Sequence, residues 1–208
     1  MKEKTTSFRQ VLPVATVSWS GALLEWLDFY TYAILAKVLA SIYFPSHDPI
    51  ASLLAAFAAL AIGFLFRPLG ALMFGKIGDQ YGRKIAFLTA ITMMMLGTLG
   101  IAVLPGYASI GVLASIGIFL LRIIQGLALG GGYGAAITYL GEFTPDRVRG
   151  LVTGFLFTTP AFGMAIAGNL ASLFQGYFGI ELFKSYGWRW CFVVAGLIVF
   201  VVALIIHI

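Results

Sequence analysis

Long apolar runs, separated by short polar segments, make up most of this chain. A helix needs about 20 apolar residues to cross the hydrocarbon core of a bilayer. Windows of that length predict six membrane-spanning helices, at residues 14–44, 52–74, 85–104, 110–139, 151–174 and 190–208. The pattern therefore predicts an all-α membrane protein, a bundle of six transmembrane helices that forms one domain over residues 1–208.

The composition agrees with a membrane-embedded chain. Hydrophobic residues make up 61% of the chain and charged residues 10%, whereas a soluble domain has about 25% charged residues. The net charge of +5 comes from basic residues at the ends of apolar runs. That distribution indicates membrane topology rather than binding of nucleic acid. The single cysteine, Cys191, cannot form an internal disulfide and is expected to be a packing residue.

The basic residues fall mainly on one side of the predicted spans. The N-terminal tail and the connections 75–84 and 141–150 hold Lys2, Lys4, Arg9, Lys76, Arg83, Lys84, Arg147 and Arg149. The other connections, 45–49, 105–109 and 176–187, hold Lys184, with Arg189 at their edge. The positive-inside rule therefore predicts a cytoplasmic N-terminus.

Two carboxylates interrupt the first predicted span near its middle. Glu25 and Asp28 stand three positions apart and so share a helix face, with Gly21 and Tyr32 along the same stripe. An ionised acid near the bilayer centre costs about 3 kcal/mol on insertion scales. This face is therefore expected to point away from lipid.

Arg122 stands in the middle of the fourth predicted span, where an unpaired guanidinium is also unfavourable. Counted from the outer ends of their spans at 1.5 Å per residue, Asp28 and Arg122 both lie roughly 20 Å deep. We therefore expect the two side chains to be in hydrogen-bonding or one-water contact. Such a pair can act as a proton switch, because protonation of Asp28 would release Arg122. A purely structural ion pair is the alternative, although buried pairs add little stability.

Four further polar residues within the spans are candidates for substrate contact: Tyr32, Arg67, Gln125 and Asn169. Arg67 either reaches down to the cytoplasmic interface or faces a cavity. Gln125 lies within one turn of Arg122, and both Gln125 and Asn169 could instead form hydrogen bonds between helices. The sequence contains no catalytic constellation and no metal-spaced cluster. We therefore expect no enzyme activity, no metal and no cofactor.

Glycines and prolines within the spans predict local features of packing. Gly126, Gly130 and Gly134 recur every four residues, which predicts a close approach of the fourth span to a neighbouring helix. Pro68 and Pro160 lie inside the second and fifth spans, where they predict kinks.

The segment 75–84, GKIGDQYGRK, predicts a tight cytoplasmic turn between the second and third spans. Its glycines permit a close reversal, and Asp79 is expected to cap the N-terminus of the third span. Charges from this turn and from the next cytoplasmic connection could form one cluster or remain ordinary solvated loop charges. The candidate cytoplasmic gate comprises Gly75, Asp79, Gly82, Arg83, Glu142 and Arg149.

These motifs resemble those of the major facilitator superfamily. The segment 75–84 resembles the superfamily's loop signature between helices two and three, and RIIQGLALGG at 122–131 resembles its fourth-helix motif. EWLDFYTY at 25–32, RPLGALMFGKIGDQYGRK at 67–84 and GWR at 187–189 resemble the metabolite:proton symporter branch, which imports organic acids and osmolytes such as proline and betaine.

The resemblance implies that Asp28 and Arg122 are the acid and the arginine associated with proton coupling, and that Glu25 is the first-helix acid of this branch. It also implies the plasma membrane of a prokaryote. Two features depart from the family pattern. Gly132 occupies a position where the branch usually has an acid, and the chain contains only the first six of the superfamily's twelve helices.

The expected function is proton-coupled symport of a small metabolite, an organic acid or osmolyte, by alternating access, with the proton gradient as driving force. The expected partners are the substrate, protons, the lipid bilayer, and either a missing C-terminal six-helix half or a second chain. The resemblance implies a substrate site between two halves that rock against each other. Three alternatives remain: a transport-silent receptor or scaffold on the same fold, a half-size transporter that works as a homodimer, and a channel, for which the sequence has no ring-forming or half-helix motif.

Overall fold

The computed structural model describes residues 8–207, apart from the side chains of residues 8–11, 13, 14, 17, 83, 84, 132–139, 141–143 and 203–207. The described chain consists of helices and short connections. The elements are α1 (Phe8–Tyr43), α2 (Pro49–Tyr81), α3 (Arg83–Val103), α4 (Tyr107–Ile110), α5 (Val112–Phe143), α6 (Asp146–Leu156), α7 (Thr159–Leu182), the π-helix η1 (Phe183–Gly187) and α8 (Arg189–His207). The predicted all-α fold class is confirmed.

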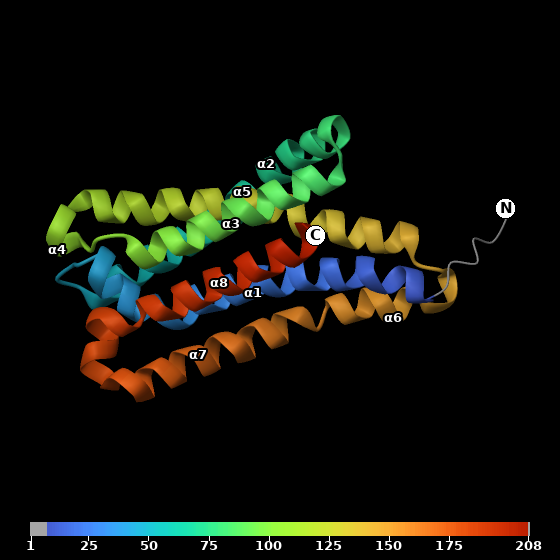
Figure 1. Ribbon diagram of the computed structural model, residues 1–208. Coiled ribbons are helices and arrows are strands. Elements are labelled where there is room, and N and C mark those ends of the chain that lie inside the picture. Colours follow the sequence, from blue (N-terminus) through green and yellow to red (C-terminus); the bar gives the residue numbers. More distant parts are fainter. Residues whose placement is uncertain (1–7, 208) are drawn as a thin grey trace.

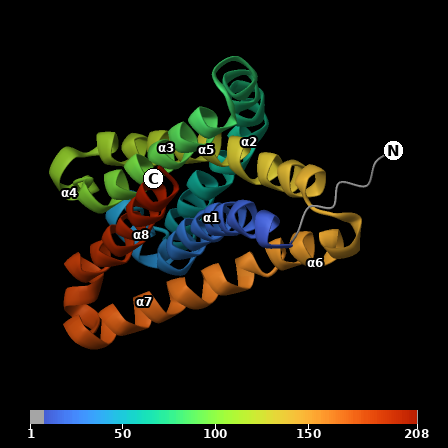
Figure 2. The same cartoon turned by 45° about the vertical axis from the view of Figure 1, so that its right-hand side comes forward.

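The long helices lie side by side in one elongated bundle (Figure 1). Helix α1 lies inside it and contacts α2, α5, α6, α7 and α8. In both views α4 and η1 lie at one end of the bundle, and the α2–α3 and α5–α6 connections lie toward the other (Figure 2). The connections that the charge pattern assigns to one side of a membrane therefore do lie toward one end of the molecule.

Four helical stretches of the described chain are long and apolar enough to cross a membrane: Pro49–Tyr81, Ile85–Val103, Val112–Gly131 and Asp146–Gly187. They correspond to the second, third, fourth and fifth predicted spans. Helix α1 is also long, 36 residues, but it is not among these four. The described apolar part of α8, Arg189–Val202, is shorter. The first and sixth spans therefore remain predictions from the sequence.

The turn predicted at 75–84 is shorter than expected. Helix α2 continues to Tyr81, and the reversal is made by Gly82, whose φ of 97° favours glycine. Asp79 therefore lies in the last turns of α2, and the N-cap position of α3 is Gly82 rather than Asp79. Because glycine has no side chain, Gly82 itself offers no side-chain cap to α3.

The fifth predicted span is divided into two helices. Helix α6 ends at Leu156 and α7 begins at Thr159, with Pro160 in its first turn. Proline is well tolerated there because the first helical N–H groups have no partner within the helix. Pro68, in contrast, lies in the interior of α2. Much of the connection predicted at 176–187 is also helical. Helix α7 extends to Leu182 with a kink at Gly179, whose φ is 74°, and η1 follows directly.

The predicted close approach of the glycine-rich helix is present between α5 and α2. A Cβ atom on Gly126 would overlap the backbone of Gly63, and one on Gly130 would overlap the backbone around Arg67. From the other side, a Cβ atom on Gly70 would overlap the carbonyl group of Leu127. These glycines bring the two backbones into contact, as small residues do between membrane helices.

Side chains also join four helices at the end of the bundle that holds α4. Arg189 of α8 donates hydrogen bonds to the carbonyl oxygens of Ala102 and Leu104 at the end of α3. The Tyr43 hydroxyl at the end of α1 donates to the Leu104 carbonyl as well, 2.8 Å away, and Ser115 of α5 donates to the Tyr43 carbonyl. These bonds fix the ends of α1, α3, α5 and α8 relative to one another.

Candidate functional site

The predicted contact between Asp28 and Arg122 is present in the core of the bundle. Arg122 Nη1 on α5 donates to Asp28 Oδ2 on α1 at 2.8 Å. The side chain of Arg122 is 4% exposed and that of Asp28 is 2% exposed. A charged pair this deeply buried needs good geometry and further hydrogen bonds to offset the loss of hydration.

Two more donors bind the other oxygen of the Asp28 carboxylate. The Thr98 hydroxyl on α3 donates to Asp28 Oδ1 at 2.7 Å, and Gln125 Nε2 on α5 donates to the same oxygen at 2.8 Å. Gln125 Nε2 also donates to Thr98 Oγ1 at 2.9 Å. Asp28 is thus bound by three donors from two helices, and hydrogen bonds to a carboxylate are among the stronger ones in proteins.

Tyr32 belongs to the same cluster. The guanidinium carbon of Arg122 lies 3.9 Å from the centroid of the Tyr32 ring, a cation–π contact. The Tyr32 hydroxyl donates to the Ala56 carbonyl of α2 at 3.1 Å, and the residue is fully buried. Arg122 Nε and Nη2 and Gln125 Oε1 are buried, and none has a hydrogen-bond partner in the described chain. The cluster around Asp28 therefore retains unused hydrogen-bonding capacity.

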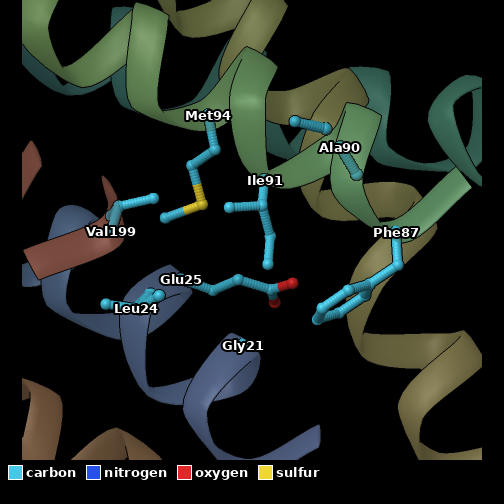
Figure 3. Close-up of a pocket in the computed structure, with 9 residues that line it drawn as sticks. Gly21, Leu24, Glu25, Phe87, Ala90, Ile91, Met94 and Val199 are labelled. Atoms are coloured by element: carbon cyan, nitrogen blue, oxygen red, sulfur yellow. The ribbon is translucent and has the colours of Figure 1, made fainter. Parts of the chain in front are cut away.

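Glu25 lies one turn from Asp28 but in different surroundings. It lines a small pocket between α1, α3, α5 and α8, whose other lining residues are Gly21, Leu24, Phe87, Ala90, Ile91, Met94, Ala128 and Val199. Its side chain extends from α1 toward Phe87 and Ile91 of α3 (Figure 3). Arg67 is close enough to interact with Glu25 electrostatically. The two acids of α1 therefore differ, because Asp28 is hydrogen-bonded and Glu25 faces mainly apolar groups.

Arg67 is half-buried and lies against an aromatic ring. Its guanidinium carbon is 3.8 Å from the centroid of the Phe64 ring, one turn earlier on α2. The side chain thus packs along α2 away from the Gly82 turn, which disfavours the alternative of reaching down to that end. Its Nε atom is buried and, among the residues that the structure describes, has no hydrogen-bond partner.

Asn169, the fourth substrate candidate, lies apart from this cluster. It is exposed on α7, and its side-chain amide donates to the Ala165 carbonyl of its own helix at 2.7 Å. This hydrogen bond of Asn169 therefore lies within α7 and does not connect α7 to another helix.

The candidate gate residues lie toward the end of the bundle opposite α4. Gly75 and Asp79 are in α2 and Gly82 forms the turn. Arg149 of α6 donates to the Thr144 carbonyl and pairs with Asp146 at 2.6 Å, a contact that the sequence analysis missed. The side chains of Arg83 and Glu142 lie outside the described residues, so the proposed charge cluster stays a prediction.

This bundle of long apolar helices around a buried acid–arginine pair has the fold of one half of a major facilitator superfamily transporter. The proton:xylose symporter XylE superposes with a TM-score of 0.82 at 15% sequence identity, over 95% of this chain and 44% of that chain. Its partially occluded inward-open form, from Escherichia coli, also gives a TM-score of 0.82, at 16% identity over 95% of this chain and 49% of that chain. These likenesses establish the fold.

The chain belongs to the sugar (and other) transporter family, whose model matches residues 14–208. It is 38% identical to the alpha-ketoglutarate permease of Escherichia coli over 185 residues, 89% of this chain and 43% of that protein. It is 36% identical to the proline/betaine transporter of Salmonella typhimurium over 180 residues, 86% of this chain and 36% of that protein.

The shikimate transporter of Escherichia coli is 36% identical over 188 residues, 90% of this chain and 43% of that protein. The chain therefore spans less than half the length of these relatives. They are transporters and permeases rather than enzymes, in agreement with the expectation from the sequence, and the resemblance to the superfamily is confirmed.

Proposed function

We propose that this chain forms the N-terminal half of a proton-coupled symporter that imports a small carboxylate-bearing metabolite by alternating access. The observation that carries the proposal is the buried cluster in which Asp28 binds Arg122, Thr98 and Gln125. An ionisable residue inside a membrane bundle usually marks a substrate or ion pathway. Asp28 is the proposed proton carrier and Arg122 its counter-ion.

Protonation of Asp28 would change the forces between α1 and α5. The charged carboxylate holds Arg122 Nη1 at 2.8 Å, and removal of its charge would leave a buried guanidinium without a counter-ion. Because Nε and Nη2 of Arg122 have no hydrogen-bond partner among the described residues, the released guanidinium would favour a packing that gives it new acceptors. Proton binding would thus shift the population between two arrangements of the bundle.

The proposed substrate class follows from the relatives together with Arg67. Alpha-ketoglutarate, shikimate, proline and betaine, which the relatives' names mention, all carry a carboxylate. Arginine binds carboxylates through two parallel hydrogen bonds, and the buried Nε of Arg67 has no partner in the described part of the chain. Arg67 is therefore the proposed carboxylate contact. Tyr32 and Gln125 are proposed to position the Asp28 cluster, and Asn169 is proposed to line the substrate path.

The proposal includes a second six-helix unit, either in the same polypeptide or in a partner chain. In such transporters the substrate lies near the membrane midplane between two repeats that rock against each other. The basic connections support a cytoplasmic position for the N-terminus and the α2–α3 turn. The candidate gate of Gly75, Asp79, Gly82, Arg83, Glu142 and Arg149 would then close the cytoplasmic side.

Uptake by lipid vesicles tests the function and the substrate class together. Vesicles that contain the assembled transporter are given an inward proton gradient and radiolabelled alpha-ketoglutarate, shikimate, proline or betaine, with xylose as a neutral comparison. The proposal predicts gradient-dependent accumulation of at least one carboxylate and internal acidification when it enters. Arg67→Gln should raise KM for that carboxylate at least tenfold, whereas Arg147→Gln, an exposed change on α6, should leave KM unchanged. Uptake whose rate and extent do not depend on the proton gradient would contradict the proposal.

A further inference from the structure

The Thr98 hydroxyl has one proton and two acceptors within reach. Its Oγ1 atom lies 2.7 Å from Asp28 Oδ1 and 3.0 Å from the Met94 carbonyl oxygen, one turn earlier on α3. Both separations suit an O–H···O hydrogen bond. Because a hydroxyl donates one proton at a time, the two contacts are alternatives, selected by the rotation of the O–H bond.

The same oxygen can also accept hydrogen bonds. Gln125 Nε2 already donates to Thr98 Oγ1 at 2.9 Å, and a hydroxyl oxygen has a second lone pair. When Asp28 is charged, the Thr98 proton points to Asp28 Oδ1. When a proton from water binds Oδ1, the new Asp28 O–H can donate to Thr98 Oγ1, while the Thr98 proton turns to the Met94 carbonyl. Thr98 Oγ1, its proton and Asp28 Oδ1 thus each have a hydrogen-bond partner in either state.

We propose that Thr98 is a positioning residue that hydrogen-bonds Asp28 in both protonation states, by turning its hydroxyl proton between Asp28 and the Met94 carbonyl. This inference rests on the proposed role of Asp28 as the proton carrier. Thr98 would lower the energy of both states, because the Asp28 oxygen that it contacts stays hydrogen-bonded to Thr98 whether or not Asp28 carries a proton.

The other threonines of α3 show why Thr98 differs. Thr89 and Thr92 donate to the Ile85 and Leu88 carbonyls, also one turn earlier, and both residues are exposed. Thr98 keeps this bond to its own helix as an option but is fully buried and faces a carboxylate on α1. Thr92 is therefore a matched control on the same helix.

The charged groups around Asp28 are few. Arg122 of α5 contacts it, Tyr32 lies under Arg122, and Glu25 is one turn away on α1 with Arg67 of α2 as an electrostatic neighbour. Residues 85–103 of α3 and 159–176 of α7 carry no Asp, Glu, Lys, Arg or His, and the charged residue of α8 within its described side chains is Arg189, at the α4 end of the bundle. Substitution of Thr98 therefore removes no charged group from the surroundings of Asp28.

Infrared spectroscopy of the purified chain in lipid vesicles, recorded across a pH series, tests the inference without requiring transport. The carboxyl band of protonated Asp28 is identified by its loss in Asp28→Asn. In Thr98→Val, which has nearly the same shape without the hydroxyl, the midpoint pH of this band should rise by about one pH unit, because the charged form loses a charge-assisted hydrogen bond. The band should also move to higher frequency, because the protonated carboxyl loses its acceptor. Thr98→Ser and Thr92→Val should show the wild-type midpoint and frequency.

An unchanged midpoint or an unchanged band frequency in Thr98→Val would overturn the inference while leaving Asp28 as the proton carrier. If the spectra contain no titrating band that disappears in Asp28→Asn, the proposed role of Asp28 fails, and the role of Thr98 fails with it. Should Thr98→Val not fold, as judged by circular dichroism, Thr98→Cys replaces it. Its weaker donor and acceptor predict a midpoint between those of the wild type and a variant without the hydroxyl.

Discussion

Arg122 is a buried cation that forms an ion pair with Asp28. It donates to Asp28 and lies over the Tyr32 ring at 3.9 Å, with almost no exposure to solvent. Removal of one member of a buried ion pair leaves an uncompensated charge, which is far more destabilising than removal of both. At the residue scale, therefore, loss of one member alone should destabilise the bundle more than loss of both.

We predict that Arg122→Leu destabilises the bundle by about 3–5 kcal/mol near neutral pH. The double variant Arg122→Leu with Asp28→Leu should recover much of that loss, since no charge then remains buried. Unfolding of the purified chain in detergent, followed by circular dichroism, measures both. Lys184→Leu is the control, because the Lys184–Glu181 pair is exposed and should contribute less than about 1 kcal/mol. Equal losses in the single and double variants would contradict this account of the pair.

The contact between Asp28 and Arg122 could be predicted because both charges need a partner at the same depth of a membrane. The part played by Thr98 could not. A threonine in a helix ordinarily binds the carbonyl one turn earlier, and the sequence does not distinguish Thr98 from Thr89 and Thr92. Its position opposite Asp28 depends on the rotation of α3 about its axis, which apolar residues on several faces of that helix leave open.

At the scale of elements, the glycines of α5 control its distance from α2. The carbonyl groups of Gly63 and Arg67 occupy the space that a Cβ atom would need at Gly126 and Gly130. Neither α2 backbone segment can move without separating the two helices. Because Arg122 precedes Gly126 by one turn of α5, such a separation would also disturb the Asp28 cluster.

We predict that Gly126→Ala destabilises the bundle by about 1–3 kcal/mol, the usual effect of overpacking. Gly154→Ala is the matched control: Gly154 is exposed on α6, and a Cβ atom there meets no other atom within 4 Å. Since alanine favours a helix more than glycine by about 1 kcal/mol, that change should be neutral or stabilising. Detergent unfolding curves compare the two, and a neutral Gly126→Ala would show that α2 and α5 are not in obligatory contact.

The spacing of the glycines was sufficient to predict a close helix pair, and the apolar windows were sufficient to predict long helices. The ends of the elements were harder to predict. Gly75 and Asp79 suggested a loop, but helix α2 continues through them to Tyr81 because Gly82 alone provides the positive φ that reverses the chain. A kink within the fifth span was expected at Pro160, whereas the chain divides into two helices just ahead of that residue, where proline can begin a helix.

For the whole molecule, the chain spans 36% to 43% of the length of the three relatives compared above. One half of the fold contains the Asp28 cluster, but a substrate site between two halves needs both. Large apolar side chains such as Leu65, Leu72 and Leu151 are more than 70% exposed in this half alone. Lipid or a second six-helix unit would cover such side chains.

We predict that the purified 208-residue chain, reconstituted by itself in vesicles, does not accumulate substrate under a proton gradient. The reason is that one half alone provides only one side of the proposed substrate site. Alternating access also needs a second six-helix unit that moves relative to the first. Radiolabelled uptake in vesicles with matched protein content measures this, with the alpha-ketoglutarate permease of Escherichia coli as a positive control. Robust uptake by the chain alone would instead indicate a half-size transporter that works as a homodimer.

The central claim, that Asp28 carries the coupling proton, is tested most directly by Asp28→Asn in the assembled transporter. Asparagine keeps the size of the side chain but cannot exchange a proton, so coupling should be lost while alternating access continues. We predict that this variant does not concentrate substrate against its gradient when a pH gradient is applied, yet still exchanges internal labelled substrate for external unlabelled substrate. Accumulation driven by the pH gradient in Asp28→Asn would contradict the claim.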